Sequence, residues 1–267
     1  MMVLIFLILG LIVGSFLNVV VYRLKVAESF VVGRSKCPHC KKPIKWYDNI
    51  PLLSFIILKF RCRDCKEKIS FQYPLVEFFT GVAFAAIGAK YFNASELVTW
   101  ATTFYYLGIM SFLIAIFVYD FLYLEIPGLV LWPAVAWTIA FNLYLDLQKT
   151  NIGNAALGSS LFSGVLAGFL AFAFFFLLSA LSKEKWMGMG DAYLAILLGL
   201  VLGWPQIILA LMLAFSSGAI IGIALIILKK KKMESQVPFA PFLVLGTLAS
   251  LFFYPSITGW YFNLMSF

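Results

Sequence analysis

Long runs of apolar residues dominate this sequence and limit what it can fold into. Eight such runs have close to the length of about 20 residues that an α-helix needs to cross a bilayer. The chain is 63% hydrophobic and only 12% charged, whereas a soluble domain is about half apolar and about a quarter charged. The sequence therefore predicts an all-α polytopic membrane protein. The runs cover residues 2–22, 73–92, 97–119, 127–146, 155–181, 191–205, 206–228 and 239–262.

Two of these runs need comment. The first has no basic segment before it and no small-residue cleavage site, so we expect a retained helix rather than a cleaved signal peptide. The sixth run is short and meets the seventh at Trp204-Pro205, where we expect a tight turn.

The positive charges indicate how the chain crosses the membrane. Eighteen of the 20 lysines and arginines lie in three polar segments, 23–71, 182–190 and 229–234. Such residues concentrate in cytoplasmic loops, and with eight spans all three segments fall on the same side. We therefore expect the N-terminus outside and the 23–71 loop in the cytoplasm. The net charge of +8 then reflects topology and attraction to the lipid bilayer, and no aromatic-basic motif indicates a nucleic-acid partner.

This pattern predicts three parts. Residues 1–22 form the first transmembrane helix. Residues 23–72 form a small cytoplasmic domain. Residues 73–267 form a membrane domain of seven helices.

All four cysteines lie in the polar loop, as two CxxC pairs separated by 21 residues. Each pair places two sulfurs on one tight turn, and two such turns complete a tetrahedral four-thiolate zinc site. A closed site of this kind is structural, not catalytic. Redox pairs or disulfides are the alternatives, and a reducing compartment argues against disulfides. The pairs are Cys37 with Cys40, and Cys62 with Cys65.

The sole histidine, His39, lies between the first two cysteines. We interpret it as a solvated loop residue, with replacement of a cysteine ligand as the alternative. One histidine excludes an HExxH metalloprotease and leaves a serine or cysteine hydrolase only this base. If the chain is a hydrolase, its acid-base groups are therefore expected to be carboxylates or lysine.

Two aspartates at the edges of apolar runs suggest such chemistry. Asp120 ends the third span, where the helix dipole disfavours a negative charge, and Asp191 begins the sixth. With the predicted topology both lie at the cytoplasmic face. Paired aspartates that share a proton carry out aspartic proteolysis, and Gly188 and Gly190 would let a substrate backbone approach Asp191.

Simpler interpretations of the carboxylates remain open. Asp191 suits a helix N-cap, and Asp120 could merely be exposed at the interface. Glu77 follows Pro74, which marks a helix start, so its place in a first helical turn is favourable without any function.

Several motifs in order along the chain make the sequence similar to the type IV prepilin peptidases, which are bifunctional leader peptidases and N-methyltransferases. The resemblance spans nearly the whole chain. Its motifs are "GSFLNVVVYRL" from Gly14, "RSKCPHCKKPIKWYDNIP" from Arg34, "CRDCKEKISFQYPLVEFFTG" from Cys62, "GMGD" from Gly188 and "VPFAPFLVLG" from Val237.

The resemblance implies a GxGD-type aspartic peptidase in the cytoplasmic (inner) membrane, with Asp120 and Asp191 as catalytic residues. The substrate would be a prepilin or pseudopilin, whose basic leader is cut at the cytoplasmic face. The new N-terminus would then be methylated from S-adenosylmethionine. The loop cysteines and Glu77 would belong to the half linked with methyl transfer, and Glu77 is a tentative cofactor-binding residue. No glycine-rich strand-to-helix turn indicates an S-adenosylmethionine site, so methylation is expected from the resemblance alone.

Two positions depart from the family pattern. Gly128 stands where an aspartate often follows "IP", and Tyr193 stands where a lysine often follows GMGD. Both positions bear on how the pocket is oriented, and neither removes a catalytic aspartate.

Three other functions compete with this one. The first is a presenilin-like GxGD intramembrane protease without methyl transfer, which the zinc-type loop argues against. The second is a transporter with the aspartates as ion sites, which their place at one face and the lack of an inverted repeat argue against. The third is a structural membrane protein that docks through its zinc loop.

Overall fold

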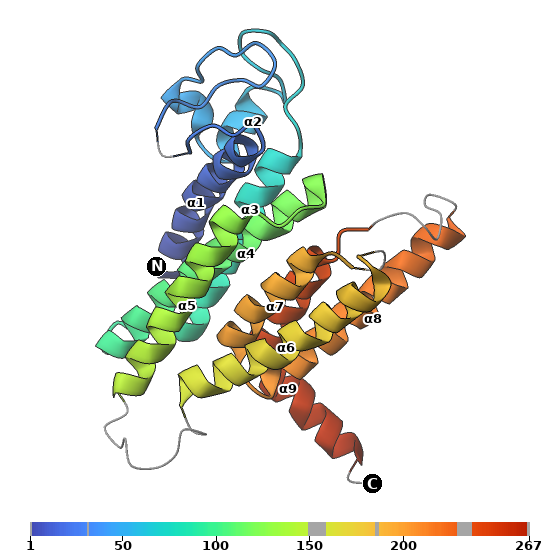
Figure 1. Cartoon of the computed structure of the whole chain (residues 1–267). Helices are drawn as coiled ribbons and strands as arrows, with labels where there is room; N and C mark the ends of the chain where they lie inside the picture. Colours follow the sequence, from blue (N-terminus) through green and yellow to red (C-terminus); the bar gives the residue numbers. More distant parts are fainter. Residues whose placement is uncertain (1, 31, 149–158, 185–186, 229–236, 266–267) are drawn as a thin grey trace. The chain divides into compact units, whose positions relative to one another are not determined.

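The computed structural model describes residues 2–30, 32–148, 159–184, 187–228 and 237–265 (Figure 1). Helices account for most of the described residues, and two isolated β-bridges lie in the polar loop. The helices are α1 (Met2–Lys25), η1 (Trp46–Asn49), α2 (Leu53–Ile57), α3 (Gln72–Tyr91), α4 (Leu97–Tyr123), α5 (Gly128–Gln148), α6 (Ser160–Ser182), α7 (Met189–Leu202), α8 (Gln206–Ile227) and α9 (Ala240–Met265).

The predicted apolar runs and the long helices coincide to within a few residues, apart from the start of the fifth run, which lies outside the described residues. The expected turn at Trp204-Pro205 is confirmed, because α7 ends at Leu202 and α8 begins at Gln206. Six of the described helices are long and apolar enough to cross a membrane. Helix α7 has 14 residues and α3 is not among the six, so the count of eight spans stays a prediction.

The all-α membrane fold is thus confirmed. Large apolar side chains on the outer faces of the long helices are exposed, among them Phe104, Leu177 and Ile227. Exposed apolar faces of this extent are costly in water and suit a helix surrounded by lipid. The chain is a multi-pass membrane protein.

The chain forms two compact units, Met1–Val118 and Tyr119–Phe267. The boundary falls within α4, so that Asp120 belongs to the second unit. The three-part division expected from the sequence is a matter of topology, and it stays a prediction.

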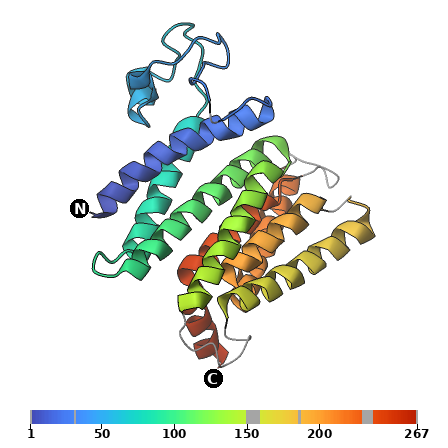
Figure 2. The same cartoon turned by 60° about the vertical axis from the view of Figure 1, so that its left-hand side comes forward.

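In the first unit α1 packs against α3 (Figures 1 and 2). A Cβ on Gly10 would lie 2.6 Å from the carbonyl oxygen of Thr80, and one on Gly14 would lie 2.7 Å from the Cα of Glu77. The two helices are therefore antiparallel and in backbone contact, as small residues allow between membrane helices. Asn18, four residues further along α1, is buried and donates to the carbonyl of Tyr73 at 3.1 Å.

In the second unit α7 contacts α5, α6, α8 and α9. This helix is short and mostly buried, because its apolar side chains face neighbours on several sides. Small residues bring α6 and α7 together, since a Cβ on Gly199 would overlap the backbone of Gly168. The buried residues of α7 are Ala192, Leu194, Ala195, Leu197, Leu198, Gly199, Leu200 and Leu202.

Candidate functional site

The carboxylate of Asp120 lies near the end of α4 and is buried, with 6% of the residue exposed. It accepts a hydrogen bond from the backbone N–H of Ala240, the first residue of α9. The first N–H groups of a helix have no partner within the helix and carry its positive end. The N-terminus of α9 therefore compensates for the unfavourable C-terminus of α4. The simple exposure of Asp120 that the sequence allowed is wrong.

Asp191 lies in the first turn of α7 and is partly buried. The N-cap of this helix is Gly188, which has no side chain to make a capping bond. The backbone N–H of Asp191 donates to the carbonyl of Gly188 at 3.2 Å. Asp191 is therefore not the N-cap residue, although an acid in a first turn still suits the helix dipole.

The two carboxylates interact, because the charge of Asp120 acts on Asp191. Among the described residues, the Oδ2 atom of Asp120 is buried and has no hydrogen-bond partner. A buried carboxylate oxygen without a partner is unusual in a folded protein. This oxygen is free to bind a proton, a water molecule or a substrate group.

The residues around Asp191 differ in how much space they leave, and this applies to Gly188, Gly190 and Tyr193. A Cβ on Gly188 would have no closer neighbour than the N of Gly190 at 4.0 Å, whereas a Cβ on Gly190 would touch the side chain of Ile126 at 3.3 Å. The backbone before Asp191 is thus open at Gly188. Tyr193 packs between two aromatic rings, with centroid distances of 5.9 Å to Trp132 and 6.1 Å to Phe172.

The sulfurs of the four loop cysteines lie within 4.8 Å of one another. Zn–S bonds of about 2.3 Å in a tetrahedron place sulfurs about 3.8 Å apart, and the sulfurs of Cys37 and Cys65 are 3.9 Å apart. All four cysteines are free, with no disulfide among them. The disulfide alternative is therefore wrong for this structure, and the site fits a metal ion.

The two CxxC turns have the same hydrogen bonds. The N–H of Cys37 donates to Lys42 and the N–H of Cys62 donates to Glu67, at 3.0 and 2.8 Å. The N–H of Cys65 donates to the sulfur of Cys62 and lowers the pKa of this thiol to about 7. The thiolate, which an N–H donor stabilises, is the form of cysteine that binds a metal ion. His39 is exposed and is not part of the cluster.

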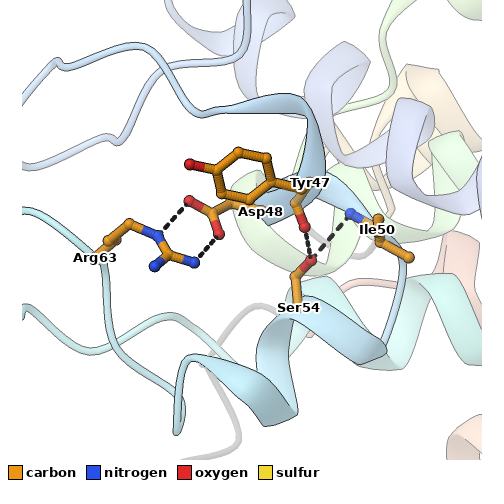
Figure 3. Close-up of polar contacts among 5 residues, drawn as sticks. All are labelled: Tyr47, Asp48, Ile50, Ser54 and Arg63. Atoms are coloured by element: carbon orange, nitrogen blue, oxygen red, sulfur yellow. Dashed lines mark hydrogen bonds and ion pairs between the residues drawn. The ribbon is translucent and has the colours of Figure 1, made fainter.

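Sequence reasoning missed the contacts that hold the segment between the two turns (Figure 3). Arg63 donates to both oxygens of Asp48, at 2.8 and 2.6 Å, and this pairing lowers the pKa of Asp48. The hydroxyl of Ser54 donates to the carbonyl of Tyr47 at 2.9 Å and accepts from the N–H of Ile50 at 3.0 Å. The sequence shows that Asp48 is an acid and Arg63 a base, but it does not show that the two residues pair.

Glu77 is buried in α3, with 8% of the residue exposed. Its carboxylate accepts from the N–H of Leu52 at 2.9 Å and from the side chain of Ser15. It therefore ties the polar loop and α1 to α3. The interpretation of Glu77 as a residue of a first helical turn is wrong, because α3 begins at Gln72 and has no acid in its first turn. The partners of Glu77 come from elsewhere in the chain.

Two family models match the chain. The Bacterial Peptidase A24 N-terminal domain matches residues 8–91, and the Type IV leader peptidase family matches residues 107–223. No solved structure matches.

Curated relatives match over most of the chain. A protein of Aeromonas hydrophila named prepilin leader peptidase/N-methyltransferase is 32% identical, over 94% of this chain and 91% of the relative. A protein of Escherichia coli named type 4 prepilin-like proteins leader peptide-processing enzyme is 32% identical, over 91% of each chain. A Myxococcus xanthus protein with the same name as the first is 34% identical, over 82% of this chain and 62% of the relative. With such matches along both units, the chain belongs to the type IV leader peptidase family.

Proposed function

We propose that the chain cleaves the basic leader of type IV prepilins or pseudopilins and then methylates the new N-terminus. The observation that carries the peptidase activity is the interaction between Asp120 and Asp191, with a buried, unpartnered oxygen on Asp120. Two carboxylates that repel each other cannot both be charged without cost, so we expect one of them to hold a proton.

Both carboxylates have a role in hydrolysis. The ionised aspartate takes a proton from water, and the resulting hydroxide attacks the carbonyl carbon of the scissile bond. The protonated aspartate donates a hydrogen bond to the carbonyl oxygen and stabilises the negative charge that develops there. A proton then passes to the leaving amine as the C–N bond breaks. The open backbone at Gly188 gives the substrate strand room beside Asp191.

The basic loops support the topology of the proposal, with the N-terminus outside and the aspartates at the cytoplasmic face of the inner membrane. Twelve lysines and arginines lie in residues 23–71, which agrees with a cytoplasmic loop. A reporter enzyme that works only in the cytoplasm should be active when it is fused after residue 45. Activity of a reporter that works only in the periplasm would show that the orientation is the opposite one.

The cysteines would hold zinc as a closed four-thiolate site that fixes the loop. For methylation we propose S-adenosylmethionine as the donor, which supplies an electrophilic methyl group when it is bound. The N-terminal domain match at residues 8–91 favours this bifunctional enzyme over a presenilin-like protease without methyl transfer.

The test is incubation of the purified chain with a synthetic prepilin and S-adenosylmethionine, followed by mass analysis. Loss of the leader identifies the peptidase, and a further methyl group on the mature peptide identifies the transferase. An unchanged peptide mass with several prepilins and pseudopilins would overturn the proposal.

A further inference from the structure

We propose that a cavity in the first unit binds S-adenosylmethionine. This inference rests on the proposed methyl transfer and gives it a place in the chain. The cavity has a volume of about 530 Å³ and lies between the second half of α1 and the polar loop. Ligand pockets for small molecules typically have about 300–1,000 Å³. The lining residues used below are Ser15, Phe16, Arg23, Phe30, Asn49 and Pro51.

A buried cation at the cavity points to a negatively charged group on the ligand. Arg23, in the last turn of α1, is only 7% exposed. Its Nη1 donates to the carbonyls of Ser29 and Val32, both at 2.8 Å, and its Nη2 donates to the carbonyl of Arg34 at 2.9 Å. No acidic side chain pairs with it in the described part of the chain. A guanidinium has five N–H donors, so two are left for a carboxylate.

The loop is shaped to hold this cation in place. Gly33 has a φ of +111°, which favours glycine, and a Cβ there would lie 3.3 Å from Nη2 of Arg23. The chain therefore wraps closely around the guanidinium and presents three carbonyls to it. Neutral carbonyls position the cation without neutralising it, and its full charge remains available to a ligand.

The rest of the lining suits the other parts of S-adenosylmethionine. Phe16 and Phe30 offer aromatic surface, which can stack on an adenine ring and attract a sulfonium cation. The amide of Asn49 can both donate to and accept from the edge of the adenine. The methionine carboxylate would meet Arg23.

Glu77 joins two walls of this cavity without lining it. Its carboxylate binds the side chain of Ser15 on one wall and the N–H of Leu52, next to Pro51, on the other. Glu77 is thus a positioning residue for the cavity. This role replaces direct contact with the cofactor as the reason for its place in the methyl-transfer half.

An anionic phospholipid headgroup is the competing occupant, since its phosphate could also meet Arg23. The test therefore uses the full chain in discs of phosphatidylcholine, which carries no net charge, without prepilin. Equilibrium dialysis with radiolabelled S-adenosylmethionine measures binding, and an azido-adenine analogue of it is photo-crosslinked and mapped by mass spectrometry. The expected crosslinks fall within residues 12–51.

The variants Arg23→Gln and Asn49→Ala should each weaken S-adenosylmethionine binding on the order of tenfold, as the loss of a charged or buried hydrogen bond does. Asn93→Ala, at an exposed loop of the same unit outside the cavity, is the matched control. Glu77→Ala should weaken binding, and Glu77→Gln, which keeps an acceptor for Leu52, should restore part of it. Leader cleavage and zinc content, measured on the same samples, should be unchanged in the control Asn93→Ala.

Crosslinks within residues 119–267, or equal affinity for S-adenosylmethionine in all variants, would overturn the inference. So would displacement of the analogue by anionic lipid and not by S-adenosylmethionine. Failure of the peptidase proposal appears separately, as absence of leader cleavage in a chain that still binds S-adenosylmethionine.

Discussion

The charge of Asp120 acts on the carboxylate of Asp191, although helices α5 and α6 separate the two residues along the chain. Asp120, near the end of α4, and Asp191, in the first turn of α7, both belong to the second unit, and α9 supplies the N–H of Ala240 to the buried carboxylate of Asp120. Three helix ends thus converge on one pair of acids. This convergence is the basis of the proposed peptidase activity.

Replacing either aspartate with asparagine should remove leader cleavage while the protein still inserts into the membrane. Asparagine keeps the size of the side chain but cannot exchange a proton, so we expect the rate to fall by roughly 10²–10⁴-fold. Gel-shift or mass analysis of a synthetic prepilin measures the rate. Glu96→Gln, at an exposed residue, is the control and should cleave normally. Normal cleavage by Asp120→Asn or Asp191→Asn would refute the aspartic mechanism.

Metal analysis of the reduced protein should find about one zinc per chain. Removing it with a chelator should make the polar loop sensitive to protease, since the two CxxC turns then lose their common ion. Cys62→Ser should do the same, whereas His39→Ala, outside the sulfur cluster, should retain the metal. Purified protein that holds no zinc in its reduced form would rule out the four-thiolate site.

The Asp48–Arg63 pair should make the loop sensitive to acid. Its pairing with Arg63 lowers the pKa of Asp48 below the ordinary value of 3.8. The stabilisation is therefore fully present above that value and is lost as the pH falls through the lower pKa of the folded state. Asp48→Asn should speed amide hydrogen exchange in residues 46–63 at pH 7.

As the pH falls below 3.8, the difference in exchange between this variant and the parent chain should shrink, because protonation of Asp48 breaks the pair in the parent. Acid also releases zinc, but it does so in both chains. Comparing the exchange rates of the variant and the parent at the same pH therefore removes this effect. A difference that persists unchanged as the pH falls would show that another contact is responsible.

Gly199→Ala should destabilise the second unit. The added Cβ would overlap the backbone of Gly168 in α6, and forcing two packed helices apart costs about 1–3 kcal/mol. Gly222→Ala in α8, where a Cβ would meet nothing within 4 Å, is the matched control. Thermal unfolding in detergent should separate the two variants, and equal unfolding temperatures would contradict the close contact between α6 and α7.

Much of this fold could be predicted from the sequence, because the signals are local. In a bilayer each spanning segment must satisfy its own backbone hydrogen bonds, so apolar runs mark helices one by one. The CxxC spacing likewise brings two sulfurs together on one turn, and the four sulfurs lie within 4.8 Å of one another. The aspartates were recognised because an acid at the edge of an apolar run is conspicuous.

Contacts between distant residues could not be read in this way. Nothing near Asp120 in the chain indicates Ala240 as its partner, nothing near Glu77 indicates Leu52, and Arg23 gives no sign of the carbonyls that surround it. The sequence also leaves the N-cap residue of α7 undecided, and the structure identifies it as Gly188. Which segments form helices and which residues can do chemistry depends on neighbours along the chain, so both can be predicted from the amino-acid order. Which of these residues meet depends on helix packing between segments far apart in the chain, so the folded structure is needed to find the pairs.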